Sequence, residues 1–285
     1  MNEQAPAPVP SDTSSLLSSE YITLQIAAFV FLIAALISII FWVTRKDAIG
    51  KTSLWINIVA TVVLTVSLVF RYINVGHIPY VQLYETFFFM AWAIAVIALI
   101  ADFSLRSRLP STLSALLSGL ILVYIIQWPE TSREGMPLVP ALQSPWLDVH
   151  IATAFLSYAG FAVSAAASVV YLFNRNDKVD ELSYRLVAFA FPLLGLGILL
   201  GSVWANEAWG RYWGWDPKET SALVTWLVYA GYLHARLVLG WKGVRAAIFN
   251  LAGFACVIFT WVGLNLLTKL IDMSSLHAYI ASANV

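Results

Sequence analysis

The side chains with the greatest chemical potential in this sequence are four histidines and a dense run of tryptophans. Trp204, Trp209, Trp213 and Trp215 lie within twelve residues, in the run WANEAWGRYWGWDPKE. Close-packed cores use few tryptophans, because each buried indole N–H needs a partner. Neutral imidazole is a common metal ligand and binds haem iron axially. Histidines beside such a platform of flat rings would suit a flat ligand that contains a metal.

The composition indicates the elements that must position these side chains. Of the 285 residues, 60% are hydrophobic and only 11% are charged, whereas about a quarter of the residues in soluble domains are charged. An integral membrane protein is therefore expected. The net charge is zero, which removes the electrostatic argument for nucleic acid as a partner. The single cysteine, Cys256, excludes an intramolecular disulfide and is interpreted as a small buried hydrophobe.

Eight apolar runs approach the roughly 20 residues that a helix needs to cross a bilayer. They cover about residues 21–43, 53–70, 83–101, 112–127, 147–173, 184–204, 218–239 and 247–270. The prediction is an all-α, polytopic bundle of about eight transmembrane helices over residues 21–285. Residues 1–20 are polar and rich in Pro and Ser, a composition that predicts a short disordered tail.

The basic residues predict the orientation of this bundle. The connections after the first, third, fifth and seventh runs carry eleven of the sixteen Lys and Arg residues. By the positive-inside rule, both termini and the tryptophan segment, about residues 204–217, then lie outside the cytoplasm. His77, His150 and His277 fall on the same outer side. His234 follows Asp216 by eighteen residues in one helix, so it lies about 27 Å deeper.

Local signals place the helix starts and suggest ordinary roles for two polar residues. Ser144 with Pro145 predicts the start of one helix, and Asp216, Pro217 and Glu219 predict a capping box at the start of another. His77 is expected to be a solvated loop histidine. Glu85 is either a first-turn acid favoured by the helix dipole or a functional group.

The residues alone allow three interpretations of this segment. His150 and His277, the tryptophan platform and the cations Arg211 and Lys218 would suit haem and its propionates. A quinone or lipid site and a purely structural aromatic belt fit the same residues. Zinc is disfavoured, because no spacing of further ligands accompanies these histidines.

The run WGRYWGWDPKET resembles the tryptophan-rich WWD signature of haem-handling proteins of cytochrome c maturation. The longer run WANEAWGRYWGWDPKETSALVTWLVYAGYLHAR is similar to the CcsA (ResC-like) branch. Members of this branch are the membrane subunit of the System II cytochrome c synthase. Further similar stretches are GHIP with LYE, PLVPALQSPWLDVHIATAFLSYA and SLHAY. The resemblance extends from about residue 77 to the C-terminus. Gln82 departs from the Asn expected before Leu-Tyr-Glu.

This resemblance implies specific roles for the residues. His150 and His277 would be the axial pair for haem b at an outer site, and the haem-binding segment would be formed by Trp204, Trp209, Trp213, Trp215 and Asp216. His234 would be a ligand of a second, deeper haem site, completed by a CcsB (ResB-like) membrane subunit. Asp216 is expected to act as a helix cap and not as an acid or base.

The resemblance also implies a reaction and a location. The chain and its partner would form a cytochrome c haem lyase that attaches haem to the C-x-x-C-H motif of apocytochrome c. It would lie in lipid in the bacterial inner membrane with its active site on the periplasmic face, or in the thylakoid membrane of a plastid.

Three rival functions are less favoured by the sequence. A System I haem-delivery protein of this length would have about six spans. A b-type cytochrome for electron transfer would need paired histidines within two helices, and only His234 is clearly intramembrane. A transporter is disfavoured because no internal repeat or paired broken helix is evident.

Overall fold

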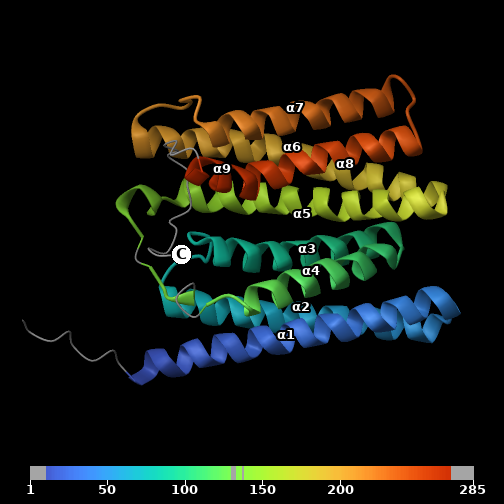
Figure 1. Ribbon diagram of the computed structural model, residues 1–285, viewed down its shortest axis with the longest axis horizontal. Coiled ribbons are helices and arrows are strands. Elements are labelled where there is room, and N and C mark those ends of the chain that lie inside the picture. The colour runs from blue at the N-terminus through green and yellow to red at the C-terminus, as the bar shows by residue number, and fades with distance from the viewer. Residues whose placement is uncertain (1–10, 130–132, 137, 271–285) are drawn as a thin grey trace, which may run out of the picture.

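The computed structural model of the chain describes residues 11–129, 133–136 and 138–270. Over these residues the protein is all-helical, without strands, and its long helices run side by side (Figure 1). They are α1 (Ser11–Thr44), α2 (Asp47–Val75), α3 (Leu83–Leu105), α4 (Leu109–Ile126), α5 (Pro145–Asn174), α6 (Asp177–Trp209), α7 (Pro217–Leu237) and α8 (Val244–Ile258). The predicted all-α membrane bundle is confirmed.

Two short elements and one irregular turn complete the described chain. The 3₁₀ turn η2 (Pro140–Leu142) precedes α5. Helix α8 continues through the π-helical turn η3 (Phe259–Gly263) into α9 (Leu264–Leu270), and the N–H of Leu264 donates to the carbonyl of Phe259, five residues back. Such π turns insert one extra residue into a helix.

Each predicted apolar run forms a helix, but one of these helices is less apolar than the others. In the described part of the chain, seven helical segments are long and apolar enough to cross a membrane, and α7 is the exception. The reason is that α7 carries Lys218 and Glu219 in its first turn and His234 and Arg236 in its last. It nevertheless packs against both α6 and α8, at the upper edge of the bundle in Figure 1. Helix α1 begins at Ser11, ten residues before the apolar run.

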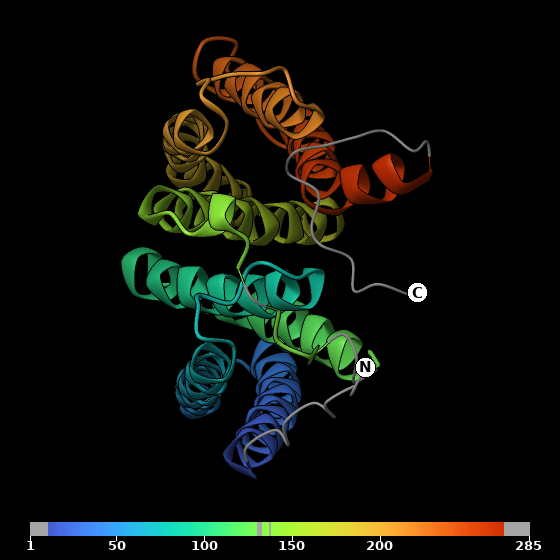
Figure 2. The same ribbon diagram turned by 90° about the vertical axis from the view of Figure 1, so that its left-hand side faces the viewer.

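The helices form two four-helix units, α1–α4 and α5–α8, stacked on each other (Figure 2). In both units the first helix packs against the second and the fourth, and the third packs against the fourth. One hydrophobic cluster fills the first unit, and a second cluster joins α5–α8 to α3. The contact between α3 and α5 therefore holds the two units together.

Two of the three equivalent connections have the same length in both units and begin with the same backbone conformation. The α1–α2 and α5–α6 connections are two residues long, and each begins with an arginine in the left-handed region, Arg45 (φ 56°) and Arg175 (φ 53°). The α2–α3 and α6–α7 connections are seven residues long and begin with Gly76 (φ 74°) and Gly210 (φ 73°). The two units therefore share one order of helix contacts and two connection lengths, a likeness that the sequence reasoning did not expect.

The connections alternate between the two ends of the bundle. One end, called here the tryptophan end, holds the α2–α3, α4–α5 and α6–α7 connections, the start of α1 and the end of α9 (Figure 1). The opposite end holds the α1–α2, α3–α4, α5–α6 and α7–α8 connections. This alternation agrees with the distribution of basic residues from which the orientation is predicted.

Polar contacts fasten the second unit near the opposite end. The Asn250 amide of α8 lies 2.8 and 2.9 Å from the hydroxyl oxygens of Ser164 and Ser168 on α5 and 3.0 Å from that of Ser183 on α6. Arg236 of α7 makes a buried ion pair with Asp180 of α6 at 2.7 Å. Small and hydroxylated residues allow close helix packing where lipid supplies no hydrophobic drive.

Candidate functional site

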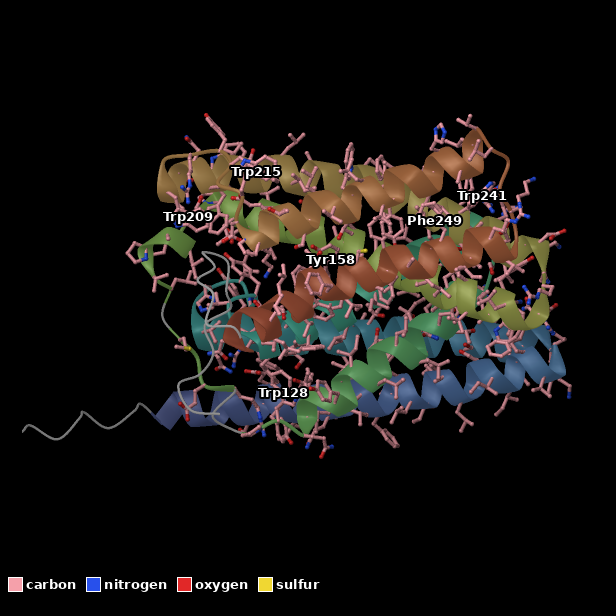
Figure 3. All side chains as sticks on the ribbon, turned by 45° about the horizontal axis from the view of Figure 1, so that its top comes forward. Trp128, Tyr158, Trp209, Trp215, Trp241 and Phe249 are labelled. Carbon is pink, nitrogen blue, oxygen red and sulfur yellow. The ribbon has the colours of Figure 1, made fainter. Side chains whose placement is uncertain are left out.

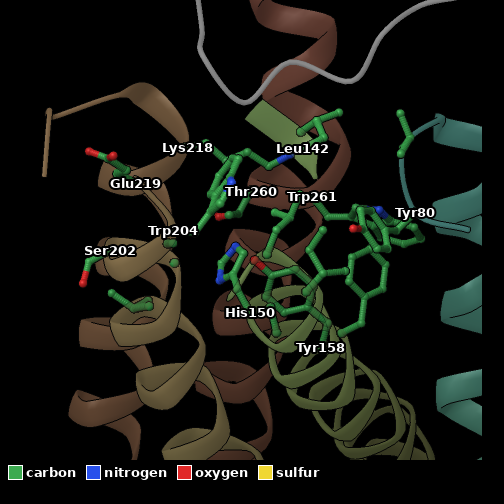
Figure 4. Close-up of a pocket in the computed structure, with 18 of the residues that line it drawn as sticks. Tyr80, Leu142, His150, Tyr158, Ser202, Trp204, Lys218, Glu219, Thr260 and Trp261 are labelled. Atoms are coloured by element: carbon green, nitrogen blue, oxygen red, sulfur yellow. The ribbon is translucent and has the colours of Figure 1, made fainter. Parts of the chain in front are cut away.

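A cavity at the tryptophan end is formed mainly by the second unit (Figure 4). It encloses about 1070 Å³ of space between the protein atoms, part of it open to solvent. Helices α5, α6 and α7, the π turn and the α2–α3 connection all contribute to its wall, and most of the wall is apolar. The residues that line the cavity include Tyr80, Val81, His150, Tyr158, Gly201, Trp204, Trp213 and Lys218. An apolar wall with a few polar side chains is typical of sites that bind organic ligands.

His150 enters this cavity from the second turn of α5. The predicted helix start is confirmed, because the Ser144 hydroxyl oxygen accepts a hydrogen bond from the N–H of Trp146. Ser144 also donates to the carboxylate of Glu207 on α6, at 2.6 Å. These bonds fix the first turn of α5 against α6 and thereby the position of the His150 side chain.

The imidazole of His150 is oriented by the backbone of α6. Its Nδ1 atom lies 2.7 Å from the carbonyl oxygen of Gly197. A carbonyl only accepts hydrogen bonds, so Nδ1 carries the proton and the neutral ring has its lone pair on Nε2. A Cβ atom on Gly201 would lie 2.7 Å from both Cε1 and Nδ1 of this ring. The missing side chain of Gly201 therefore makes room for the imidazole.

Trp204 and Trp209 pack beside His150. The Trp204 ring is nearly parallel to the imidazole, at an interplanar angle of 12° and a centroid distance of 6.2 Å. Its indole N–H donates to the carbonyl of Ala141 at 2.9 Å, which satisfies the buried polar atom. Trp209 packs edge-on against Trp204 at 4.7 Å. Trp204 therefore forms part of the cavity wall, and Trp209 packs against Trp204.

The other two tryptophans of the motif behave differently. Trp213 lines the cavity. Trp215 lies nearly perpendicular to Trp213, at 5.8 Å and 89°, and its side chain is 70% exposed (Figure 3). Its backbone adopts φ 57°, which is uncommon for a bulky residue. The structure thus places Trp204 and Trp213 on the cavity and directs Trp215 outward.

The predicted capping box at the start of α7 is confirmed. Asp216 accepts a hydrogen bond from the N–H of Lys218 at 2.9 Å. The Glu219 carboxylate accepts from the N–H groups of Gly214 at 2.9 Å and Asp216 at 3.2 Å. These bonds hold the loop that carries Trp213 and place the Lys218 side chain at the cavity wall. Arg211 is exposed nearby.

Two tyrosines and two glycines at the site were missed by the sequence reasoning. Figure 4 shows the hydroxyl of buried Tyr158 on the side of His150. Tyr80 donates to the Asp148 carboxylate at 2.5 Å, and burial, with this bond as a second cause, raises the pKa of the Tyr80 phenol above its ordinary value. Gly197 and Gly201 form a G-x-x-x-G pattern, which is a recognisable signal for close approach to a helix.

His77 is not the solvated loop residue that was expected. Its side chain is only 8% exposed, and its ring nitrogens lie 3.0 and 3.1 Å from the carbonyl oxygens of Ile78 and Met136. It therefore ties the α2–α3 connection to the α4–α5 connection. The expectation failed because no local signal indicates that the two connections meet.

Glu85 has a structural role at the start of α3. Its carboxylate accepts from the N–H groups of Val81 and Gln82 at 2.9 and 3.1 Å and pairs with buried Arg71 at 2.8 Å. Gln82, where Asn was expected, donates its side-chain amide to the carbonyl of Glu134 at 2.7 Å. Both residues fix the α2–α3 connection beside the cavity.

His234 and His277 are not part of the cavity as described. His234 is exposed on α7 near the opposite end of the bundle. Within the described chain its ring has no hydrogen-bond partner, while Arg236 beside it is paired with Asp180. His277 lies outside the described residues.

Fold and site together define a class: polytopic helical membrane proteins with a histidine- and tryptophan-lined cavity at one end of the bundle. The particular family follows from the sequence. Residues 80–272 match the family model described as cytochrome C assembly protein. The chain belongs to this family and, within it, to the CcsA branch, as the resemblance implied. It is an integral membrane protein of cytochrome c biogenesis.

The similar proteins support this assignment over most of the chain. CcsA of Prochlorococcus marinus (strain MIT 9303) is 35% identical over 300 residues, which covers 90% of this chain and 94% of that protein. CcsA of Chlamydomonas reinhardtii is 38% identical over 238 residues, 78% of this chain and 66% of that protein.

A solved structure has a similar fold. The cytochrome c haem lyase CcmF superposes with a TM-score of 0.69 at 15% identity, over 96% of this chain and 51% of that one. The chain thus spans about half of CcmF. At this identity the likeness shows the fold alone.

Proposed function

We propose that this chain is the haem-handling subunit of a System II cytochrome c synthase. It holds haem b at the tryptophan end and, with a CcsB (ResB-like) partner, attaches it to the C-x-x-C-H motif of apocytochrome c. The observation that supports this proposal is the cavity at the tryptophan end. In it His150, oriented by Gly197, lies beside Trp204, and Trp213 of the tryptophan loop, Gly210–Asp216, lines the same cavity.

The residues of the cavity suit a tetrapyrrole substrate. The Nε2 atom of His150 would bind iron through its lone pair. The hydrogen bond from Nδ1 to a carbonyl is the usual second contact of a metal-binding histidine. Flat indoles and apolar side chains give walls for the macrocycle. Lys218 at the wall and Arg211 beside it supply positive charge for propionates.

His277 is proposed as the second axial ligand. The described chain ends at Leu270, and α9 ends at the same end of the bundle as the cavity. Seven further residues reach His277, a length that spans at most about 25 Å. A ligand from this segment and one from α5 would approach iron from separate elements.

Bound haem supplies the iron and the vinyl groups to which the two thiols add, each sulfur forming a C–S bond while its proton goes to the other vinyl carbon. The chain's own contribution is orientation and exclusion of water. His150 and His277 fill both axial positions until the histidine of the apocytochrome motif replaces one of them. Asp216 acts by capping α7, which holds the tryptophan loop in place.

His234 is proposed as a ligand of a second haem site near the opposite end. Its exposed ring faces out of the bundle, where a partner subunit can supply the other ligand. The tryptophan end would then face the periplasm in the bacterial inner membrane, or the thylakoid lumen in a plastid, as the basic residues predict.

The rival functions lack such support. His150 and His234 lie toward opposite ends of the bundle, so they are not the pair of a single b-type haem. A System I delivery protein remains the alternative nearest in chemistry. A transporter is disfavoured by membership in the cytochrome c assembly family.

The test is purification of the chain with its partner, followed by optical spectroscopy and a cytochrome c assay in a deletion strain. We expect His150→Ala and His277→Ala each to lose the low-spin spectrum, and added imidazole to restore it. Trp55→Ala, an exposed tryptophan on α2, serves as the control. A double histidine variant that retains haem as well as the wild type would refute the assignment.

A further inference from the structure

The α2–α3 connection is a second loop of the same construction as the tryptophan loop. We infer that this loop, Gly76–Gln82, is the duplicated counterpart of the tryptophan loop, Gly210–Asp216, and forms the second wall of the tetrapyrrole pocket. The identity of the ligand rests on the proposed function, whereas the equivalence of the loops rests on geometry. The name first loop is used below for Gly76–Gln82.

The two loops match in length and at both ends. Each begins with a glycine in the left-handed region that ends the preceding helix, and the sixth residue after it is the N-cap, Gln82 (ψ 152°) in one loop and Asp216 (ψ 145°) in the other. They differ just before the N-cap, where Trp215 has φ 57° and Val81 is not in the left-handed region. In each unit a Glu-Thr pair follows, with the glutamate nine residues after the glycine. Glycine is needed at the first position, because the left-handed conformation is strained for other residues.

A glutamate at the same position holds each loop through one carboxylate oxygen, and in both loops one of its two donors is the N–H of the N-cap residue. One carboxylate oxygen of Glu85 accepts from the N–H groups of Val81 and Gln82, at 2.9 and 3.1 Å. One carboxylate oxygen of Glu219 accepts from Gly214 and Asp216, at 2.9 and 3.2 Å. Both are reciprocal capping boxes at the start of the third helix of a unit.

The loops differ in how firmly they are anchored. Glu85 also pairs with fully buried Arg71, and His77 and Gln82 bond the first loop to the α4–α5 connection. In the described chain Glu219 makes no ion pair, and the tryptophan loop exposes Tyr212 and Trp215. The first loop is therefore the fixed wall, and the tryptophan loop is the more open one.

Both loops reach the same cavity. Tyr80 and Val81 of the first loop line it, as Trp213 of the tryptophan loop does. Tyr80 also donates to Asp148, two residues before His150 in α5, at 2.5 Å. The first loop thus contacts the turn that presents His150 and offers an apolar surface with one neutral phenol, which suits the hydrophobic part of a flat tetrapyrrole.

Protection of single cysteines tests this inference on the full-length chain in membranes. In a Cys256→Ala background, Tyr80→Cys, Val81→Cys and Trp213→Cys are labelled with a small thiol reagent, with and without zinc protoporphyrin. Ile78→Cys, exposed on the same loop, and Val238→Cys, exposed near the opposite end, are the controls. Val81→Cys keeps the test available if Tyr80→Cys does not fold.

At a porphyrin concentration ten times its dissociation constant, we expect labelling to slow about tenfold at 80, 81 and 213. The controls should be unchanged. Protection at 213 without protection at 80 or 81 would overturn the inference and leave the proposed function standing. Protection at none of the three, or equally at Val238, would overturn both.

Discussion

The Nδ1 atom of His150 and the carbonyl oxygen of Gly197 are 2.7 Å apart and join α5 to α6 at the cavity. The contact exists because Gly201, one turn further along α6, has no side chain where the imidazole lies. The orientation of the proposed iron ligand thus depends on a backbone groove in the neighbouring helix.

Gly201→Ala should displace the imidazole, since the new Cβ would lie 2.7 Å from two ring atoms. We expect haem affinity to fall on the order of tenfold or more, with a loss of stability of about 1–3 kcal/mol. Haem titration followed by absorbance measures the first effect, and thermal unfolding measures the second.

Gly119→Ala in α4 is the matched control, because its Cβ would meet no atom closer than 3.5 Å. It should leave haem binding unchanged. If both alanine variants bind haem like the wild type, the groove does not position His150.

Asp216 can be tested for capping against acid–base chemistry. Asn caps a helix as well as Asp does, so Asp216→Asn should keep haem binding and cytochrome assembly, whereas Asp216→Ala should destabilise the chain by about 1 kcal/mol and weaken both. Haem content and thermal unfolding of the two variants give the comparison. Inactivity of Asp216→Asn with normal stability would instead indicate a chemical role for the carboxylate.

The buried ion pair between Arg71 and Glu85 should be essential to the first loop. Arg71→Ala leaves a buried carboxylate without its partner and should cost about 3–5 kcal/mol. Arg185→Ala breaks the exposed pair with Glu181 and should cost less than about 0.5 kcal/mol. Denaturation in detergent compares the two, and similar losses would show that the Arg71 pair is dispensable.

His234→Ala separates haem supply from folding. The side chain is exposed, so unfolding free energy should change by no more than about 0.5 kcal/mol. Haem at the outer site should nevertheless decrease in cells, and haem added directly to the purified variant should still bind. Normal haem content in cells would remove His234 from the proposed path.

The sequence predicted the features that depend on local chemistry. Apolar runs long enough for a bilayer became helices, and Ser144 and Asp216 cap α5 and α7 as expected. Capping is decided by residues within a few positions of each other, so no tertiary information is needed.

The features that were missed depend on contacts between distant segments. Burial of His77 follows from its contact with Met136 on another connection, and the opposite directions of Trp213 and Trp215 follow from one left-handed residue. The likeness of the two units was missed because the N-caps at equivalent positions are different residues, Gln82 in one unit and Asp216 in the other.

The π-helical turn Phe259–Gly263 determines which way the side chains of the following helix α9 point around the helix axis. Helix α4, the fourth helix of the first unit, is a regular α-helix that ends at Ile126. Each α-helical residue advances the chain by about 100° around the axis. Insertion or deletion of one residue in this stretch would therefore rotate the side chains of Leu264–Leu270 to another side of the helix. It would also change the direction in which the chain leaves α9.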